Sequence, residues 1–444
     1  MRCLTPGLAV AAVMASATSV FAMPLAKGPY LQDLTARSVV IRGETAPPAA
    51  LSIEVRTQEG KGDPVVVKDS ASAFHSVGIP GLAPRTRYAY RVIVGGLADV
   101  AASGTFTTAP EDATPFTFLV YGDDRSGDEA HAAVVRTLLD APSDFLLHTG
   151  DFVEDGTDKD AWRRFFDIEA SLIQSRCVFA CVGNHELLEP GGGSFLRYFG
   201  PSTSKTAADA DLHLYRSFRW SDARFFLLNG MDSFTTSGEK EWLRGELERA
   251  DSEPGLVWRF VVVHHGPWSS GPHGKNSRLL EAGIPELLAQ HKVDLIWSGH
   301  DHIYERGEQS GLRYVVSGGG GAPLYKIAAK LPSTRRVEAA YHFVEASVSP
   351  ERVSLVVKRV DGSLLEKCGF TKTSADWDCD GTAASPPSTS SSSLAAPPSG
   401  EGTRPHPARC GCTCVGRAVG TSVAGFLAVA LAASLGALRR RSRG

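Results

Sequence analysis

The chain has 444 residues and a formal net charge of −3, a length that predicts two or three domains with substantial hydrophobic cores. Hydrophobic residues make up 43% of the sequence, which is typical of a globular protein. Positive and negative charges are mixed along the chain, and its one concentrated basic run lies at the very end. The composition therefore argues against nucleic acid as the main partner.

The chain opens with a segment typical of export signals. Residues 1–22 begin with Arg2, continue as an apolar run and finish on small residues around Ala22, as cleavage by signal peptidase requires. We therefore expect residues 1–22 to be a signal peptide. Residues 27–110 then carry short apolar runs that turn residues separate at intervals of roughly ten residues, which predicts a β-sandwich.

From residue 115 to 372, apolar runs alternate with helix-like segments, and this alternation predicts an α/β domain. We expect helices at 128–139, 159–173, 240–250 and 278–291. Five of the apolar runs have the character of buried strands, and each finishes on Asp, Asn or His. The residues at these strand ends are Asp123, Asp151, Asn184 with His185, His264 with His265, and His300 with His302.

These five strand ends are expected to meet, because ligands in α/β folds bind at the carboxyl ends of the strands. Taken alone, each residue has an ordinary structural explanation, such as an aspartate that caps a turn or a histidine that is hydrogen-bonded in the core. Five strand ends that all carry such residues favour a binding site over five separate structural roles. Carboxylate, amide and imidazole ligands suit Mn, Fe or Zn, so the pattern predicts a pair of metal ions that attracts phosphate.

The order of the motifs resembles that of a known enzyme family. The motifs are GD at 122–123 and 150–151, GNHE at 183–186, HHGPW at 264–268 and GHDHIYER at 299–306. The set resembles the calcineurin-like metallophosphoesterases, and most closely the purple acid phosphatase branch, over roughly residues 27–372. The resemblance implies a fibronectin type III-like sandwich at 27–110. It also implies an αββα sandwich of two mixed sheets flanked by helices at 115–372.

The resemblance further implies six ligands around two metal ions. Asp151 would bridge the ions, and the other ligands divide into Asp123 and His302 for the first ion and Asn184, His264 and His300 for the second. The HHGPW segment aligns with the family's motif when its first histidine is the ligand, which favours His264 over His265. The implied reaction is attack of a metal-bound hydroxide on the phosphorus of a phosphate mono- or diester.

Two further histidines receive roles from the same resemblance. His185 would protonate the leaving group, and His273 would contact the substrate. Glu186 is expected to orient its loop rather than to react. Two other histidines have ordinary expectations: His148 is expected to pack inside its strand, and His131 is expected to be exposed on a helix.

The first loop departs from the family pattern. Arg125 stands where a histidine ligand often follows, and Glu154 stands where purple acid phosphatases supply a tyrosine. Either Glu154, a water molecule or another residue completes the shell of the first ion, or that site is weak. Arg125 either clamps a phosphate oxygen or forms a salt bridge to Asp124 or Asp128.

The C-terminal region has the composition of a tether. Residues 380–409 are rich in Pro and Ser, which predicts a disordered stalk. Residues 410–444 combine three clustered cysteines, a charge-free run at 418–438 that is long enough to span a bilayer, and a final RRRSRG. The combination resembles the sorting tails of myxobacterial surface proteins. We expect an exported protein that is anchored at the outer face of a membrane.

The cysteines divide into two groups. Cys368 and Cys379 flank a polar loop and are the best candidates for a disulfide in an exported protein. Cys177 and Cys181 lie too far apart along one strand to be bridged, so we expect them to be small core residues.

The sequence therefore predicts an exported phosphohydrolase that uses two Fe, Mn or Zn ions, acts on a phosphate ester and contacts a membrane through its tail. The alternative is a surface binding or adhesion protein whose phosphoesterase domain is degenerate and inactive. The missing ligand of the first ion supports this alternative, whereas the intact pair Asn184 and His185 favours the enzyme.

Overall fold

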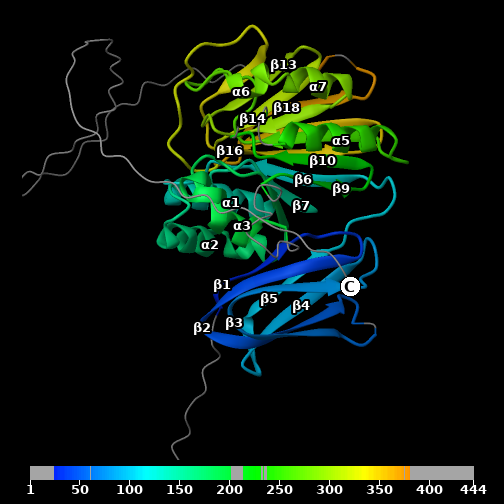
Figure 1. Cartoon of the computed structure of the whole chain (residues 1–444), viewed down its shortest axis with the longest axis vertical. Coiled ribbons are helices and arrows are strands. Elements are labelled where there is room, and N and C mark those ends of the chain that lie inside the picture. Colours follow the sequence, from blue (N-terminus) through cyan, green and yellow to red (C-terminus); the bar gives the residue numbers. More distant parts are fainter. Residues whose placement is uncertain are drawn as a thin grey trace, which may run out of the picture. The chain divides into compact units, whose positions relative to one another are not determined.

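The computed structural model describes residues 25–380, with gaps at 61, 202–213, 232–233, 235–237 and 375 (Figure 1). The predicted signal peptide and everything after residue 380, including the predicted stalk and the apolar run at 418–438, lie outside the described residues. Within the part that is described, no helix combines the length and the apolarity needed to cross a membrane.

The N-terminal strands form one five-stranded antiparallel sheet in the order β1-β2-β4-β5, with β3 paired to β2. They are β1 (Leu25–Gln32), β2 (Ser38–Thr57), β3 (Val65–Pro80), β4 (Arg87–Val94) and β5 (Leu97–Thr107). Strand β2 changes partners at Pro47 and Pro48, pairing first with β1 and the end of β3, then with the start of β3 and with β4. Proline lacks the N–H group that a ladder needs, so the register shifts there. Division into a two-layered fibronectin type III-like sandwich stays a prediction.

Two seven-stranded mixed sheets follow (Figure 1). The first has the order β19-β18-β17-β16-β6-β7-β8, with the strands β6 (Phe116–Tyr121), β7 (Phe145–His148), β8 (Cys177–Ala180), β16 (His342–Val348), β17 (Arg352–Arg359), β18 (Leu364–Thr371) and β19 (Asp378–Cys379). The second has the order β15-β13-β14-β12-β11-β10-β9, with the strands β9 (Arg216–Trp220), β10 (Ala223–Leu228), β11 (Trp258–Val263), β12 (Leu295–Ser298), β13 (Tyr304–Gln309), β14 (Leu312–Ser317) and β15 (Thr334–Glu338). Each sheet contains a parallel group, β6-β7-β8 and β10-β11-β12-β14 respectively.

An aromatic core joins the two mixed sheets. The ring of Phe118 in the first sheet lies 5.3 Å from that of Phe225 and 5.9 Å from that of Trp297 in the second, centroid to centroid. The same core holds the free cysteines Cys177 and Cys181, which confirms them as small core residues. Helices cover the outer faces: α1 (Asp128–Asp140), α2 (Lys159–Ile173) and α3 (Gly193–Phe199) on the first sheet, and α5 (Glu239–Asp251), α6 (Ser277–Glu281) and α7 (Ile284–Gln290) on the second. The predicted α/β architecture with mixed sheets is confirmed.

One predicted helix is two helices in the structure. The segment 278–291 divides into α6 and α7 at Gly283, whose φ of 65° is left-handed. Pro285 occupies the first turn of α7, a position where the missing N–H costs nothing, whereas in the interior of a continuous helix it would remove a hydrogen bond. The glycine and the proline together therefore end one helix and begin the next.

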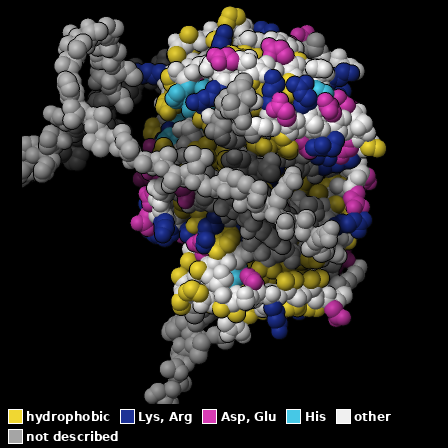
Figure 2. Space-filling model, in the orientation of Figure 1, with side chains coloured by type: hydrophobic (Ala, Val, Ile, Leu, Met, Phe, Trp, Pro, Cys, Tyr) yellow, Lys and Arg dark blue, Asp and Glu magenta, His cyan; other side chains and the backbone are white. Residues whose placement is uncertain are grey.

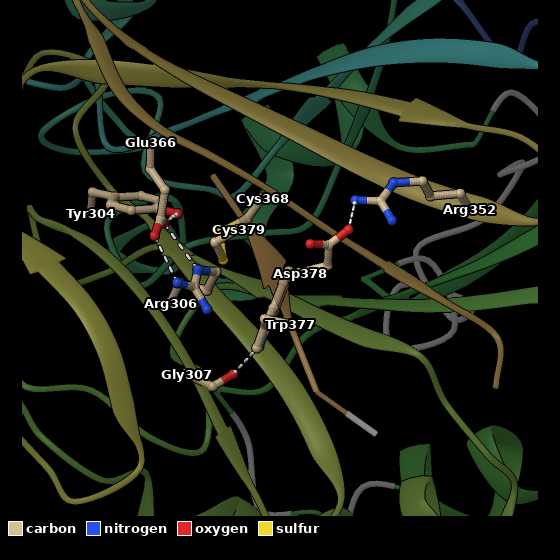
Figure 3. The surroundings of a disulfide bond; sticks show 9 residues. All are labelled: Tyr304, Arg306, Gly307, Arg352, Glu366, Cys368, Trp377, Asp378 and Cys379. Carbon is tan, nitrogen blue, oxygen red and sulfur yellow. Dashed lines mark hydrogen bonds and ion pairs between the residues drawn. A yellow bond between two sulfur atoms is a disulfide. The ribbon is translucent and has the colours of Figure 1, made fainter. Parts of the chain in front are cut away.

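Cys368 on β18 and Cys379 on β19 form the predicted disulfide (Figure 3). Next to it, the buried carboxylate of Glu366 accepts hydrogen bonds from Nε and Nη2 of Arg306 at 2.9 and 2.7 Å, and from the hydroxyl of Tyr304 at 2.6 Å. This buried cluster connects β13 to β18, and so connects the two mixed sheets. The disulfide fixes the last described strand, β19, to the same place.

Charged side chains of both signs are interspersed on the face drawn in Figure 2. Some of them pair at the surface, such as Arg37 with Glu111 at 2.7 Å and Arg163 with Asp167 at 3.6 Å. Exposed pairs of this kind contribute little to stability individually. The fold therefore depends mainly on its buried core.

Candidate metal centre

The polar strand ends meet at one edge of the two mixed sheets. Strands β6, β7 and β8 run parallel in the first sheet, and β11 and β12 run parallel in the second. Parallel neighbours present their carboxyl ends at the same edge, so the loops after them come together. The structure brings together the six predicted metal ligands: Asp123, Asp151, Asn184, His264, His300 and His302.

His264 is the centre of the second predicted metal site. Its Nε2 atom lies 3.1 Å from Oδ1 of Asn184, 3.1 Å from Nδ1 of His300 and 3.3 Å from Oδ2 of Asp151. Asp151, His264 and His300 offer ligand atoms that all lie within 4.8 Å of one another. His264 and Asp151 are buried, and His300 is half-buried. The donor atoms therefore converge on one small volume.

This arrangement fits a cation. Nδ1 of His264 donates a hydrogen bond to the carbonyl oxygen of Thr149 at 2.8 Å, which leaves the lone pair of Nε2 facing the other ligand atoms. Several lone pairs then point at each other unless a positive charge lies among them. Burial acts to lower the pKa of His264, but the carboxylates of Asp151 and Asp123 outweigh it and raise that pKa to about 10. The site thus attracts positive charge, as a metal centre must.

Asp123 and His302 form the other predicted set. Nε2 of His302 lies 3.7 Å from Oδ1 of Asp123, and both residues are buried. Nδ1 of His302 donates to the carbonyl oxygen of Pro323 at 2.7 Å, so its Nε2 lone pair also faces inward. The backbone N–H of His300 donates to both carboxylate oxygens of Asp123, at 3.0 and 2.9 Å, and holds that carboxylate in place.

The backbone around the centre is strained and tightly packed. Asp123, Asp151 and His300 have φ values of 58°, 60° and 70°, in a left-handed region that residues other than glycine seldom adopt. A Cβ atom on Gly183 would lie 2.1 Å from Oδ1 of Asp151, and one on Gly299 would lie 2.2 Å from Oδ2 of Asp123. The glycines of the motifs therefore let the loops approach the carboxylates directly.

Arg125 lies among the ligands of the first predicted ion. Its Nε is 3.3 Å from Oδ2 of Asp151, its Nη1 is 2.5 Å from Oε2 of Glu154, and its Nη2 is 3.5 Å from Nε2 of His302. Of the two alternatives for Arg125, the salt bridge to Asp124 or Asp128 is not the one that the described residues form, because the side chain turns toward the carboxylates of Asp151 and Glu154. Glu154 binds this guanidinium in the structure, and its service as a metal ligand stays a prediction.

Comparison with known proteins agrees with this geometry. Residues 116–304 match the family model for calcineurin-like phosphoesterases. This part of the chain is a calcineurin-like phosphoesterase domain. The matched range contains all the residues that the sequence predicted for the site, from Asp123 to His302.

Curated relatives of the chain include purple acid phosphatases. Purple acid phosphatase 23 of Arabidopsis thaliana is 24% identical over 274 residues, which cover 53% of this chain and 58% of that protein. The phosphoenolpyruvate phosphatase of Allium cepa is 28% identical over 258 residues, covering 54% of this chain and 52% of that protein. The chain therefore spans less than two thirds of the length of these relatives.

Solved structures share the fold of the phosphoesterase. The purple acid phosphatase PPD1 from yellow lupin (Lupinus luteus) seeds superimposes with a TM-score of 0.64 at 16% identity, covering 79% of this chain and 75% of that one. PhoD superimposes with a TM-score of 0.66 at 12% identity, covering 82% of this chain and 93% of that one. At such low identity these similarities establish the architecture alone.

The GNHE loop of the phosphoesterase domain places a histidine at the open side of the centre. Nδ1 of His185 donates to the carbonyl oxygen of Glu154 at 2.6 Å, and its Nε2 lies 3.9 Å from Oδ2 of Asp151. Next in the chain, the buried carboxylate of Glu186 accepts hydrogen bonds from the backbone N–H groups of Asp151 and Gly183, at 3.0 and 2.9 Å. Glu186 thus ties two ligand-bearing loops together, in line with its predicted role.

His273 lies beside the centre, and its contact with the substrate stays a prediction. Its ring centroid is 4.2 Å from that of His300, and its Nδ1 is hydrogen-bonded to Oδ1 of Asp301 at 2.8 Å. Sequence reasoning missed Tyr325, whose ring stacks on His302 at a centroid distance of 3.9 Å. The sequence feature that could have indicated Tyr325 is its position at the end of the glycine-rich segment after β14. Tyr325 forms part of the wall beside the first set of ligands.

His148 and His131, the two histidines for which the sequence predicted no part in the centre, are both buried. His148 lies inside β7, as predicted, and its Nε2 donates to Oδ1 of Asp124 at 2.7 Å. The predicted exposure of His131 was wrong, because its side chain faces α2 and is hydrogen-bonded to Glu169 at 2.8 Å. His131 belongs to the buried stripe of α1, which also holds Val134, Val135 and Leu138.

Proposed function

We propose that the chain is an exported metal-dependent phosphohydrolase that cleaves phosphate mono- or diesters at this centre. The convergence of ligand atoms around Nε2 of His264 carries the proposal, because the oxygen of Asn184, the nitrogen of His300 and the carboxylate of Asp151 all lie within 3.3 Å of it. Buried oxygen and nitrogen lone pairs that face one another are unfavourable by themselves, whereas a bound cation stabilises them.

The residues fit two metal ions that share Asp151. Bound ions of this kind lower the pKa of water toward neutrality and offset the negative charge that builds up on a phosphoryl group. The chain's own contribution is a fixed set of ligands. His264 and His302 are each oriented by a backbone carbonyl, at 2.8 and 2.7 Å, so their donor atoms are in position before anything binds.

His185 supplies the proton for the leaving group in this proposal. Its Nδ1 is engaged by the carbonyl oxygen of Glu154, so Nε2 is the atom that faces the substrate. Its side chain is 17% exposed, which leaves it in reach of a ligand that enters from solvent. An imidazole in this position can donate a proton to the leaving oxygen and so serve as a general acid.

Arg125 binds a phosphoryl oxygen in this proposal. Its guanidinium is 11% exposed beside Asp151, and its other partner, Glu154, is 56% exposed. The guanidinium can leave Glu154 at little cost, since exposed ion pairs are weak, and can then donate two parallel hydrogen bonds to a phosphate. Arg125 and His185 would hold the substrate from two sides.

Export and surface anchoring belong to the same proposal and rest on the sequence of residues 1–22 and 410–444. The substrate is a phosphate ester of a class still to be assigned. One relative is named a phosphoenolpyruvate phosphatase, so a substrate panel should include that monoester beside aryl monoesters and diesters.

The test combines a metal count with turnover. The full chain is purified and loaded with Fe, Mn or Zn, and its metal content and its hydrolysis of the panel are measured. We expect bound ions and turnover in the wild type, and loss of both turnover and one ion in Asn184→Ala. Asp167→Asn, which changes an exposed residue of α2, serves as the control.

The proposal would be contradicted if wild-type protein bound no metal at the centre and hydrolysed no ester with any of the metals. That result would favour the alternative hypothesis, a surface binding or adhesion protein with an inactive phosphoesterase domain. The convergence of all six predicted ligands favours the enzyme over that alternative.

A further inference from the structure

A second buried cluster of metal-ligating side chains lies behind the first loop. Asp124 follows the predicted ligand Asp123, His131 lies on α1 and Glu169 lies on α2, and none of the three side chains is more than 3% exposed. Nε2 of His131 is 3.3 Å from Oδ2 of Asp124 and 2.8 Å from Oε1 of Glu169. Ligand atoms from all three residues lie within 4.8 Å of one another.

Two carboxylate oxygens in this cluster have no hydrogen-bond donor. Oδ2 of Asp124 and Oε2 of Glu169 are fully buried, and neither accepts a hydrogen bond within the described residues. A buried oxygen left in this way destabilises the fold, and it does so more strongly when it is charged. A positively charged partner between the two carboxylates would satisfy both oxygens.

The charges of the cluster do not balance either. The backbone N–H of Gly150 donates to Nδ1 of His148 at 3.1 Å, and Nε2 of His148 donates to Oδ1 of Asp124. The hydroxyl of Tyr121 donates to Oε1 of Glu169 at 3.1 Å and is neutral, because burial raises its pKa.

No lysine or arginine in the described ranges forms an ion pair with either carboxylate. The two nearest arginines along the chain are engaged elsewhere, Arg125 by Asp151 and Glu154, and Arg164 by Asp128 at 3.5 Å. A protonated His131 would still leave one net negative charge buried. A divalent cation would neutralise both carboxylates.

A cavity borders two of the three residues. It has a volume of about 260 Å³, and its lining includes Asp124, His131, Arg164 and Phe165 but not Glu169. The space exceeds what a hydrated metal ion needs, and it provides the entry path that a metal site requires.

We propose that Asp124, His131 and Glu169 bind a divalent transition-metal ion, Zn²⁺ or Mn²⁺, at a site separate from the phosphoesterase centre. One imidazole and two carboxylates are a donor set that these ions accept. Ligand atoms around a tetrahedral Zn²⁺ lie roughly 3.3 Å apart, close to the spacings seen here. Asp124 lies between Asp123 and Arg125, so this third ion would fix the loop that carries both residues.

The proposal is tested in a chain that lacks the phosphoesterase centre. The full-length double variant Asp151→Ala, His264→Ala, which leaves each predicted ion of the centre only two of its ligands, is dialysed against Zn²⁺, freed of loosely bound metal and analysed for metal content and thermal midpoint. We expect one Zn²⁺ per chain and a midpoint that rises by several degrees when Zn²⁺ is added. Glu169→Gln in this background should lose the ion and the shift, whereas the exposed neighbour Asp167→Asn should keep both.

A folded double variant without Zn²⁺ would overturn the proposal, and a protonated His131 would then account for the cluster. Retention of the ion in Glu169→Gln would also overturn it. If the double variant does not fold, wild-type crystals replace it: an anomalous peak at the zinc edge between Asp124, His131 and Glu169 supports the site, and its absence rejects it. The number of zinc ions bound per chain is measured without any turnover assay. Failure of the phosphohydrolase proposal would therefore not change the outcome of this test.

Discussion

Glu186 is the residue whose replacement tests most directly how the centre is held together. Its buried carboxylate accepts hydrogen bonds from four backbone N–H groups, those of Phe152 at 2.8 Å, Gly183 at 2.9 Å, Asp151 at 3.0 Å and Val153 at 3.4 Å. Replacement by glutamine keeps the shape of the side chain but turns one acceptor oxygen into an NH₂ group. That group would face two N–H donors and leave both without an acceptor.

The structure gives the size of the expected effect. Two buried N–H groups without acceptors cost about 1–3 kcal/mol each, so Glu186→Gln should lower the free energy of unfolding by about 4 kcal/mol. The loops of Asp151 and Gly183 should also separate, and metal content should fall. Glu189→Gln is the matched control, because Glu189 accepts from one backbone N–H, that of Ser194 at 2.6 Å, and glutamine can still do so.

Urea unfolding of the full chain, monitored by tryptophan fluorescence and extrapolated to water, measures the difference. Metal analysis of the same samples tests the second expectation. A Glu186→Gln protein within 1 kcal/mol of the control, with the metal content of the wild type, would show that the carboxylate does not hold the loops and would refute the reasoning.

Three further predictions follow from contacts described above. Arg125→Ala should raise KM for a phosphate ester about tenfold or more, since a hydrogen bond to a charged group contributes about 1.5–3 kcal/mol; an unchanged KM in steady-state kinetics would exclude the proposed contact. Cys368→Ser should lower the free energy of unfolding by about 2–3 kcal/mol, as expected for a short loop closed by a disulfide, and equal urea midpoints for variant and wild type would contradict this. Chelation by EDTA should lower the thermal midpoint and stop turnover, and added Mn²⁺, Zn²⁺ or Fe²⁺ should restore both; full turnover by metal-free protein would contradict a metal mechanism.

The ligand set could be predicted from sequence because each ligand follows a buried strand. The carboxyl ends of parallel strands lie at the same edge of a sheet. Once the strands are recognised, Asp123, Asp151 and His264 are therefore expected to lie near one another. Three of the four expected helices were also found close to their predicted bounds, since their apolar periodicity is strong.

The expectations that failed concern side chains whose contacts come from residues distant in sequence. One of the two alternatives for Arg125 was a salt bridge to a neighbour in the chain, but tertiary folding brings Asp151 and Glu154 to its guanidinium instead. His131 was expected to be exposed as an isolated histidine, although it begins the 3.6-residue stripe that continues through Val134 and Leu138. Its burial depends on Glu169, which supplies a polar partner from another helix.

The disulfide at the end of the described chain has a mechanical consequence. Strand β19 pairs with β18 at two positions, Cys368 with Cys379 and Gly369 with Asp378, so its hydrogen bonds would yield one after another to a pull on the following residues. The covalent bond passes that tension directly into β18, which is paired along its length with β17. A load applied beyond residue 380 would thus be carried by the backbone of the first mixed sheet and not by the two ladder positions of β19 alone.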